Sequence, residues 1–274
     1  MADPRDRNRP VIRLRVLRTE RITPHMIRVV SGGEGLAAFR PNEFTDAYVK
    51  VAFPSPGVTY PEPLDMRTIK AELPSEHWPR LRTYTVRYYD AAAGELTIDF
   101  VHHGDEGLAG PWAASLRPGD EVWLLGPGGA YAPSADADWH LLVGDESALP
   151  AIGAALEAMP AGAPVRAFVL VEDAAEEQPL ATKGDAQIRW LRRAEGDDLV
   201  AAVRELEFPE GDVHAFVHGE AGFVKELRRH LLDERGVRKD RLSISGYWRR
   251  GRTDEVWRQE KAAERAQEEA AAVR

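Results

Sequence analysis

Residues 82–87 read Arg-Thr-Tyr-Thr-Val-Arg, and polar and apolar side chains alternate along them. This alternation is typical of a β-strand, with Tyr84 on one face and Thr83 and Thr85 on the other. An aromatic ring can stack on a flat ligand, a hydroxyl group can hydrogen-bond to a ring nitrogen, and guanidinium groups bind phosphate with paired hydrogen bonds. The stretch therefore predicts either a strand that binds a flat anionic ligand or an ordinary exposed strand.

The composition excludes several classes of protein. The chain has 274 residues, 43% hydrophobic and 30% charged, as expected for a soluble protein of one or two domains. There is no apolar run of ~18 residues and no apolar segment at the N-terminus, so we expect a cytoplasmic protein without membrane insertion. The absence of cysteine excludes disulfides, iron–sulfur clusters and thiol chemistry. The net charge of −9 argues against nucleic acid as a partner.

The first half of the chain predicts a small antiparallel barrel. Its segments alternate between polar and apolar residues and are bounded by clusters of glycine and proline, which is typical of short antiparallel strands. A proline-rich stretch, 54–79, is expected to be an irregular surface loop. The expected strands are 11–17, 26–30, 48–53, 82–89, 96–101 and 122–125.

In the second half the pattern changes to alternating strands and helices, which indicates a parallel sheet like that of nucleotide-binding domains. The apolar run 167–171 suits a strand buried on both faces, and 147–159 carries apolar residues at helical spacing. We therefore expect three parts: a barrel domain over residues 1–134, an α/β domain over 135–253 and a helical tail over 254–274.

Residues 99–113, DFVHHGDEGLAGPWA, join a predicted strand to a short helix through a glycine-rich turn. Backbone N–H groups beside Gly104 and Gly107 could approach a phosphate, although plain glycine-rich turns are common. His102 and His103 suggest a metal site at first sight. Adjacent residues of a strand point to opposite faces, so we predict no metal site here.

Four segments in this order resemble the siderophore-interacting protein family, whose members are FAD-dependent ferric-siderophore reductases of the ferredoxin-reductase-like superfamily. They are RTYTVR from Arg82, DFVHHGDEG from Asp99, LLVGDESALPAI from Leu141 and GYWRRGRTDE from Gly246. The resemblance runs from the first strand to about Glu255. It implies an antiparallel FAD-binding barrel followed by a parallel, nucleotide-binding-like domain and a C-terminal helix.

The resemblance implies a set of FAD-binding residues. It places Tyr84 against the flavin ring, Thr85 near its N5 atom and Arg82 on phosphate. Where the family carries Pro-Ala-Ser this chain has Leu108-Ala109-Gly110, which removes one hydroxyl contact to the FAD phosphate. The implied set comprises Arg82, Thr83, Tyr84, Thr85, Asp99, Val101, His103, Gly107, Ala109, Trp112 and Ala113.

Two further sets are implied on the other side of the flavin. The turn after residue 143 lacks the Gly-x-Gly-x-x-Gly fingerprint, and its two carboxylates would repel a pyrophosphate; by resemblance it lies where the nicotinamide approaches. The segment that begins at Gly246, GYWRRGR, has aromatic residues beside arginines, which together form a platform for anionic ligands. By resemblance this segment lines the ferric-siderophore site. The nicotinamide-side set is Gly144, Asp145, Glu146, Ser147, Gly219 and Glu220; the substrate set is Lys50, Tyr247, Trp248, Arg249, Arg250 and Arg252.

The residues leave the type of nicotinamide open. Glu172 and Asp173 end a predicted strand, and an acid there can bind the ribose 2′-hydroxyl of NADH and disfavours a 2′-phosphate. Arg189, Arg192 and Arg193 could supply the opposite preference.

The leading hypothesis is an enzyme in which NADH or NADPH reduces FAD and the flavin reduces the iron of a ferric siderophore. We expect no catalytic acid or base, because the cofactor performs the chemistry. A ferredoxin could replace the nicotinamide as donor. The alternatives are a non-catalytic siderophore carrier and a general flavin diaphorase or ferric-chelate reductase. We expect a monomer.

Overall fold

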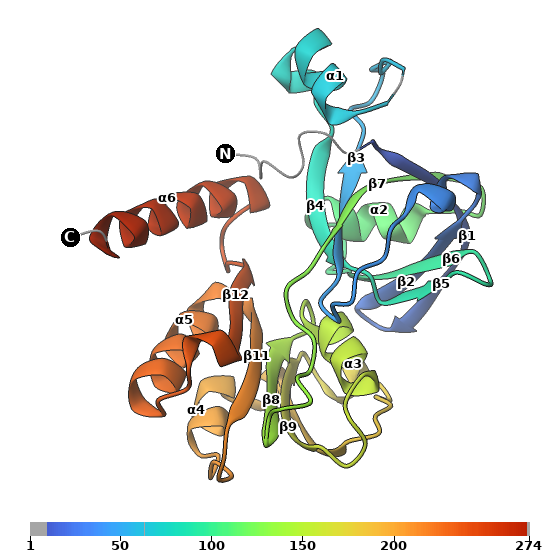
Figure 1. The fold of residues 1–274 in the computed structure, drawn as a ribbon. Helices are drawn as coiled ribbons and strands as arrows, with labels where there is room; N and C mark the ends of the chain where they lie inside the picture. Colours follow the sequence, from blue (N-terminus) through green and yellow to red (C-terminus); the bar gives the residue numbers. More distant parts are fainter. Residues whose placement is uncertain (1–9, 63, 273–274) are drawn as a thin grey trace.

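The computed structural model describes residues 10–62 and 64–272. An antiparallel sheet is followed by a parallel sheet and a C-terminal helix, so the predicted fold class is confirmed (Figure 1). The ends of the first and third predicted parts, residues 1–9 and 273–274, lie outside the described residues. Among the described residues no helix is both long and apolar enough to span a membrane.

Seven strands of the described chain form the antiparallel sheet, in the order β4-β3-β7-β1-β2-β6-β5. Two short helices, α1 and α2, accompany it (Figure 1). The elements are β1 (Ile12–Thr23), β2 (Met26–Gly32), β3 (Tyr48–Phe53), α1 (Met66–Glu72), β4 (Arg80–Thr85), β5 (Tyr88–Asp90), β6 (Glu95–Val101), α2 (Ala109–Ser115) and β7 (Glu121–Gly128).

The antiparallel sheet curls so that β4 approaches β6. The ring of Tyr84 packs on that of Phe100, with centroids 4.4 Å apart, and the backbone N–H of Arg87 donates to the carbonyl of Thr97 over 2.8 Å. Trp112 of α2 packs edge-on against Phe100, with centroids 5.6 Å apart. The curled sheet and α2 therefore enclose one apolar core, as expected for a small barrel.

The expectation of an irregular loop over 54–79 is wrong in part, because this stretch contains α1. Asp65 caps the helix and accepts hydrogen bonds from the backbone N–H groups of Arg67 and Thr68, both 2.9 Å long. The helix buries Met66 and Ile69 against the barrel wall. It has only seven residues, too few for its apolar spacing to stand out among the prolines.

The expectation of one strand over 82–89 is also wrong, because the strand breaks after Thr85. The N–H of Val86 donates to Ala47 over 2.7 Å, whereas that of Arg87 donates to Thr97 on β6. The chain thus crosses from one edge of the barrel to the other at this point. The break directs the Arg87 side chain toward the second half of the chain.

Five strands form the parallel sheet, in the order β10-β9-β8-β11-β12. Its strands are β8 (Trp139–Asp145), β9 (Pro164–Val171), β10 (Asp185–Arg192), β11 (Val213–Glu220) and β12 (Leu242–Trp248). Its helices are α3 (Leu149–Glu157), α4 (Leu199–Arg204) and α5 (Ala221–Arg229), and α6 (Asp254–Ala272) follows. Short turns are η2 (Glu34–Ala38), η3 (Ser75–His77), η4 (Ala174–Glu176), η5 (Arg193–Glu195), η6 (His230–Glu234) and η7 (Lys239–Arg241).

Helices cover both faces of the parallel sheet. Ile152 of α3 packs in one cluster with Phe216 and Val169, whereas α4 and α5 bury Val203 and Leu227 against the other face. Figure 1 shows that α3 lies between the parallel sheet and the antiparallel one. This helix is therefore placed to connect the two halves of the chain.

Two histidines of the parallel sheet are buried. His140 has no exposed surface, and burial lowers its pKa to about 4, with smaller contributions from the nearby His214 and Arg241. His218 is 5% exposed, and burial lowers its pKa to about 3. Both imidazoles are therefore neutral at pH 7 in the folded protein.

We expect these histidines to make the protein acid-labile. In the unfolded chain their pKa is about 6.5, so below that pH protons bind the unfolded state first and stabilise it. Stability should therefore be full above about pH 6.5 and fall as the pH decreases toward about 4 for His140. Urea unfolding at pH 7, 6 and 5 should show a shallower pH dependence for His140→Leu than for the parent. The control is His77→Gln on the exposed His77; if both variants keep the parental pH dependence, burial of His140 is not the cause.

Candidate functional site

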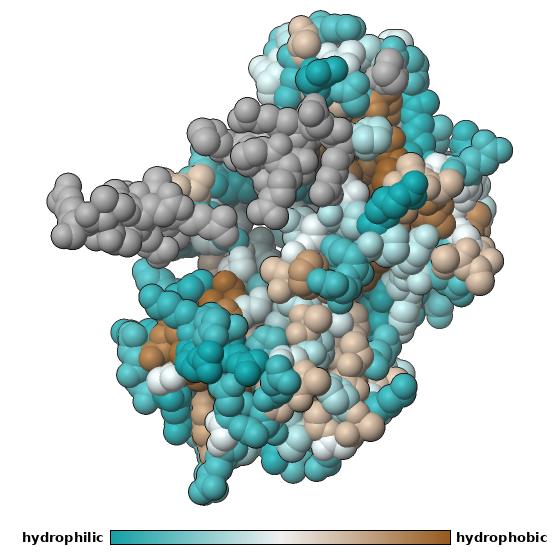
Figure 2. Space-filling model, viewed as in Figure 1, coloured by the Kyte–Doolittle hydropathy of each residue, from teal (hydrophilic) through white to brown (hydrophobic). Residues whose placement is uncertain are grey.

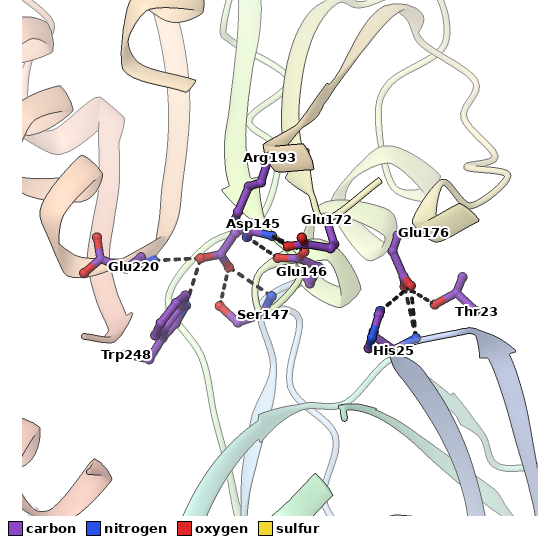
Figure 3. Close-up of polar contacts among 10 residues, drawn as sticks. All are labelled: Thr23, His25, Asp145, Glu146, Ser147, Glu172, Glu176, Arg193, Glu220 and Trp248. Atoms are coloured by element: carbon purple, nitrogen blue, oxygen red, sulfur yellow. Dashed lines mark hydrogen bonds and ion pairs between the residues drawn. The ribbon is translucent and has the colours of Figure 1, made fainter. Parts of the chain in front are cut away.

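The carboxyl ends of three parallel strands meet around one buried carboxylate, that of Asp145 at the end of β8 (Figure 3). It accepts hydrogen bonds from the backbone N–H of Glu220 and from the indole N–H of Trp248, both 2.8 Å long. It also accepts one from the N–H of Ser147, 2.9 Å long. Burial raises the pKa of Asp145, while these donors oppose the rise. Asp145 thus fixes the ends of β8, β11 and β12 relative to one another.

Two glycines permit this close approach. Gly219 has φ 139°, and a Cβ there would lie 2.6 Å from the ring of Phe223 and 2.7 Å from the Asp145 carboxylate. A Cβ on Gly144 would lie 2.6 Å from the Cβ of Ala148. Both glycines belong to the predicted nicotinamide-side set, and each has a packing role around Asp145.

A second carboxylate of the same turn, Glu146, pairs with Arg193, the residue that follows β10 (Figure 3). Both terminal nitrogens of the guanidinium donate to it, and the two side chains are only 8% and 21% exposed. Arg193 also lies 3.6 Å from Glu172, the residue that follows β9. The ends of β8, β9 and β10 are therefore joined by charge pairs.

A buried contact joins the parallel sheet to the barrel through Glu176 (Figure 3). This residue of η4 is 2% exposed and accepts hydrogen bonds from the hydroxyl of Thr23, at 2.5 Å, and from the backbone N–H of His25, at 3.1 Å. The His25 ring nitrogen Nδ1 lies 2.7 Å from the same carboxylate, and its ring lies 6.0 Å from that of His103. Glu176 could not be singled out from the sequence, since its surroundings, DAAEEQ, are typical of a solvated turn.

The helix α3 makes a second connection to the barrel. Glu157 receives two hydrogen bonds from the Arg87 guanidinium, 2.7 and 3.0 Å long, and one from the Tyr88 hydroxyl, 3.1 Å long. Arg87 is buried, and a Cβ on Gly153 would lie only 3.0 Å from it. No motif in the sequence indicates this pairing.

The structure brings together several residues of the predicted FAD set. Tyr84 of β4 and Trp112 of α2 both contact Phe100 of β6, and burial raises the pKa of Tyr84. Ala109 and Ala113 are buried on the same side of α2. Val101 ends β6 beside them, and His103 lies two residues further along the chain.

Two predicted FAD residues have other surroundings. The Asp99 carboxylate is 4% exposed and receives two hydrogen bonds from Arg28, each 2.7 Å long. Thr83 is exposed and lies opposite Lys50 in the β3–β4 ladder. The Asp99 side chain is thus committed to Arg28, and Thr83 shares a sheet face with the predicted substrate lysine.

Arg82, predicted to bind phosphate, pairs with the first residues of α6. Its guanidinium lies 3.2 Å from Asp254 and 2.6 Å from Glu255. Arg258 of the same helix donates to the carbonyl of Leu81 over 2.7 Å. The C-terminal helix is therefore docked on β4, which is one of the two edge strands of the antiparallel sheet.

The same helix also reaches the predicted substrate arginines. Glu260 lies 2.7 Å from Arg252 and 3.6 Å from Arg249. The backbone N–H of Arg250 donates to Glu220 over 3.2 Å. Tyr247 packs its ring 4.9 Å from His218, and burial raises its pKa. Figure 2 shows hydrophilic residues over most of the face viewed, with hydrophobic ones visible in small groups.

The barrel side of the site fits FAD. Gly104 and Gly107 have φ 60° and 80°, and within the described chain no heavy atom other than those of their immediate chain neighbours lies within 4 Å of where their Cβ atoms would be. The backbone between β6 and α2 is therefore open to a close ligand. The helix α2 has only seven residues, so backbone N–H groups, rather than a helix dipole, are the groups in this turn that suit a diphosphate.

Two family models match the chain, one described as the siderophore-interacting FAD-binding domain over residues 15–131 and one as siderophore-interacting protein over residues 137–251. The ferric vibriobactin reductase of Vibrio cholerae is 34% identical over 250 residues, which are 89% of this chain and 92% of that protein. The NADPH-dependent ferric-chelate reductase of Escherichia coli is 34% identical over 241 residues, 86% of this chain and 91% of that protein.

Solved structures agree with this comparison. The siderophore-interacting protein SipS of Aeromonas hydrophila superposes with a TM-score of 0.79 at 31% identity, covering 93% of this chain and 98% of that one. A ferredoxin reductase of carbazole 1,9a-dioxygenase superposes with a TM-score of 0.60 at 15% identity, covering 87% of this chain and 67% of that one, and shows the shared fold.

Proposed function

The chain belongs to the siderophore-interacting protein family, and on this premise we propose that it is an FAD-dependent oxidoreductase that reduces the iron of a ferric siderophore with electrons from NAD(P)H. The observation that carries the proposal is the fit of the barrel to FAD. An aromatic cluster around Tyr84, an open glycine backbone at Gly104 and Gly107, and the Arg82 guanidinium belong to one barrel.

On this proposal FAD, when bound, would supply the chemistry that links a two-electron donor, NAD(P)H, to the one-electron reduction of Fe(III), whose reduced form binds hard oxygen ligands more weakly. The protein positions its partners. Tyr84, already fixed on Phe100, would offer the stacking surface and Thr85 its hydroxyl. The backbone near Gly107 would hold phosphate, together with the Arg82 guanidinium once it exchanges its partially exposed partner Glu255 for the ligand. His103, whose ring lies 6.0 Å from that of His25, would contact the FAD from just beyond the end of β6.

On the substrate side, Lys50, Tyr247 and Trp248 form the surroundings that we propose for the ferric siderophore. Trp248 is 37% exposed although its indole N–H is held by Asp145. Arg249 and Arg252 both pair with Glu260 of α6. This carboxylate partly neutralises the positive charge that the two arginines present to an anionic chelate.

We further propose that the protein acts as a monomer in the cytoplasm, where NAD(P)H is available. Its formal charge of −9 supports a soluble partner rather than an anionic surface. Ferredoxin remains the alternative donor, because the carboxylates of Asp145 and Glu146 disfavour a pyrophosphate at the first turn of the parallel sheet.

An anaerobic absorption experiment tests the function. The purified protein should show oxidised flavin bands that bleach on addition of NADH or NADPH and return on addition of a ferric siderophore. Bleaching by reduced ferredoxin alone would assign the donor to ferredoxin. Equal rates with ferricyanide and several ferric chelates would indicate a general diaphorase. A protein that cannot be loaded with FAD but binds the ferric siderophore would be a carrier and would contradict the proposal.

A further inference from the structure

The fold does not decide which nicotinamide serves as donor. We infer that this chain discriminates in favour of NADH, and that Glu172 is the residue that recognises the ribose. The inference rests on the proposed function, since it concerns the electron donor of the same site. The inferred preference for NADH differs from the donor named for the Escherichia coli relative, which is NADPH-dependent.

The position of Glu172 is the first step. It follows β9 directly, at the carboxyl edge of the parallel sheet, where such sheets bind their ligands. A carboxylate at the end of the second strand accepts hydrogen bonds from a ribose 2′-hydroxyl. The Glu172 side chain is 50% exposed and only 3.6 Å from Arg193 at its nearest approach, so one face of the carboxylate remains available.

Its neighbour, Asp173, is not available in the same way. The Asp173 carboxylate accepts a 2.7 Å hydrogen bond from the backbone N–H of Ala175 and thereby caps η4. This turn in turn positions Glu176 against the barrel. Of the two acids that follow β9, Glu172 is therefore the one suited to bind a ligand.

Of the three arginines that could favour a 2′-phosphate, Arg189 lies opposite Phe168, away from the carboxyl edge of the sheet. The other two, Arg192 and Arg193, lie at that edge but are committed to carboxylates. Arg192 ends β10, which runs parallel to β9 with Arg192 opposite Val171. Glu177 accepts from its Nε and Nη2 atoms over 2.8 and 2.7 Å, and Glu195 accepts from Nη1 over 3.1 Å.

Arg193 is committed to a more buried partner. Both of its terminal nitrogens donate to Glu146, whose side chain is 8% exposed, and Glu172 is the second carboxylate near it. A phosphate would have to replace Glu146 and leave that buried charge unpaired, which is unfavourable.

The local charge balance gives the direction of the discrimination. The two arginines are surrounded by four carboxylates, those of Glu146, Glu172, Glu177 and Glu195. This edge therefore carries excess negative charge before any ligand binds. The additional charge of a 2′-phosphate is repelled here, whereas an uncharged 2′-hydroxyl is not.

Anaerobic stopped-flow bleaching of the FAD-loaded protein tests the inference. We expect the second-order rate constant with NADH to exceed that with NADPH by at least about tenfold, or ~1.4 kcal/mol. In Glu172→Gln this ratio should fall several-fold through faster reduction by NADPH. In the double variant Glu172→Gln with Glu177→Gln it should fall further, because Arg192 loses its main partner.

The matched control is Glu207→Gln. Glu207 is exposed and precedes β11, so it lies toward the opposite, amino edge of the sheet, and its removal changes the net charge equally. We expect it to leave the ratio unchanged. A ratio that fell as much in the control would show a general charge effect and would overturn the role of Glu172.

A binding measurement separates this inference from the proposed function. Calorimetric titration with ADP-ribose and with 2′-phospho-ADP-ribose involves no hydride transfer. Tighter binding of ADP-ribose than of the 2′-phosphorylated compound supports the inference, even if neither NADH nor NADPH bleaches the flavin. A failure to bleach would contradict only the proposal that NAD(P)H is the electron donor. Equal or tighter binding of the 2′-phosphorylated compound, or failure of both to bind, would overturn the inference, whether or not the flavin is reduced.

Discussion

Replacing Arg193 with methionine is expected to lower the free energy of unfolding by about 3–5 kcal/mol. The change removes the partner of Glu146, whose side chain is 8% exposed, and leaves a buried carboxylate without its charge pair. Removing one member of a buried pair costs more than the pair itself contributes, because the remaining charge is still desolvated.

Chemical denaturation of the parent, Arg193→Met, and the double variant with Glu146→Leu measures the effect. The double variant should recover most of the loss, because no unpaired charge remains. The control is Arg189→Met, since Arg189 is 54% exposed and lies 3.9 Å from Glu205; its loss should cost less than about 0.5 kcal/mol. Equal losses of unfolding free energy for Arg193→Met and the control would show that the Arg193–Glu146 pair contributes no more to stability than an exposed pair.

Replacing Arg82 with alanine is expected to weaken FAD binding about 10- to 150-fold. Hydrogen bonds to a charged group contribute about 1.5–3 kcal/mol, and one decade of affinity corresponds to ~1.4 kcal/mol. Quenching of FAD fluorescence during titration of the FAD-free protein measures the dissociation constant directly.

The structure makes a control necessary, because Arg82 also holds Asp254 and Glu255 of α6. Arg258→Ala removes a different contact between the same helix and β4, the hydrogen bond to Leu81. We expect this variant to keep FAD affinity within about threefold of the parent, a change of ~0.7 kcal/mol. If Arg258→Ala lost as much affinity as Arg82→Ala, docking of α6 rather than phosphate binding would explain both losses.

The regular part of the fold could be predicted from the sequence because it depends on local patterns. The apolar run 167–171 predicts a strand buried on both faces, and the structure has one there. The alternation around Tyr84 correctly places Tyr84 against the core and Thr83 on the exposed face, although Thr85 is buried as well. The prediction over 54–79 was wrong in part because the short helix α1, capped by Asp65, forms within that stretch. The prediction over 82–89 was wrong because the backbone hydrogen bonds of Val86 and Arg87 redirect the chain.

The contacts between distant segments could not be predicted in this way. Asp145 stands in the turn before a helix, where an acid is ordinarily expected only to cap that helix. In the structure it joins the ends of β11 and β12 through Glu220 and Trp248. Glu176 and Glu157 look like solvated acids, and their partners lie 153 and 70 residues away in Thr23 and Arg87. Such pairings depend on tertiary approach, which neither periodicity nor a short motif encodes.

The polar connections between the two halves have a consequence for the kind of substrate that the protein admits. They lie at the hairpin of β1 and β2, at α3 and at α6, through Glu176, Glu157 and Arg82. A single attachment would act as a hinge, but three separate ones oppose swivelling of one half against the other. Chelates of different size must then be accommodated by rearrangement of side chains around the predicted substrate residues, and not by rotation of one half against the other.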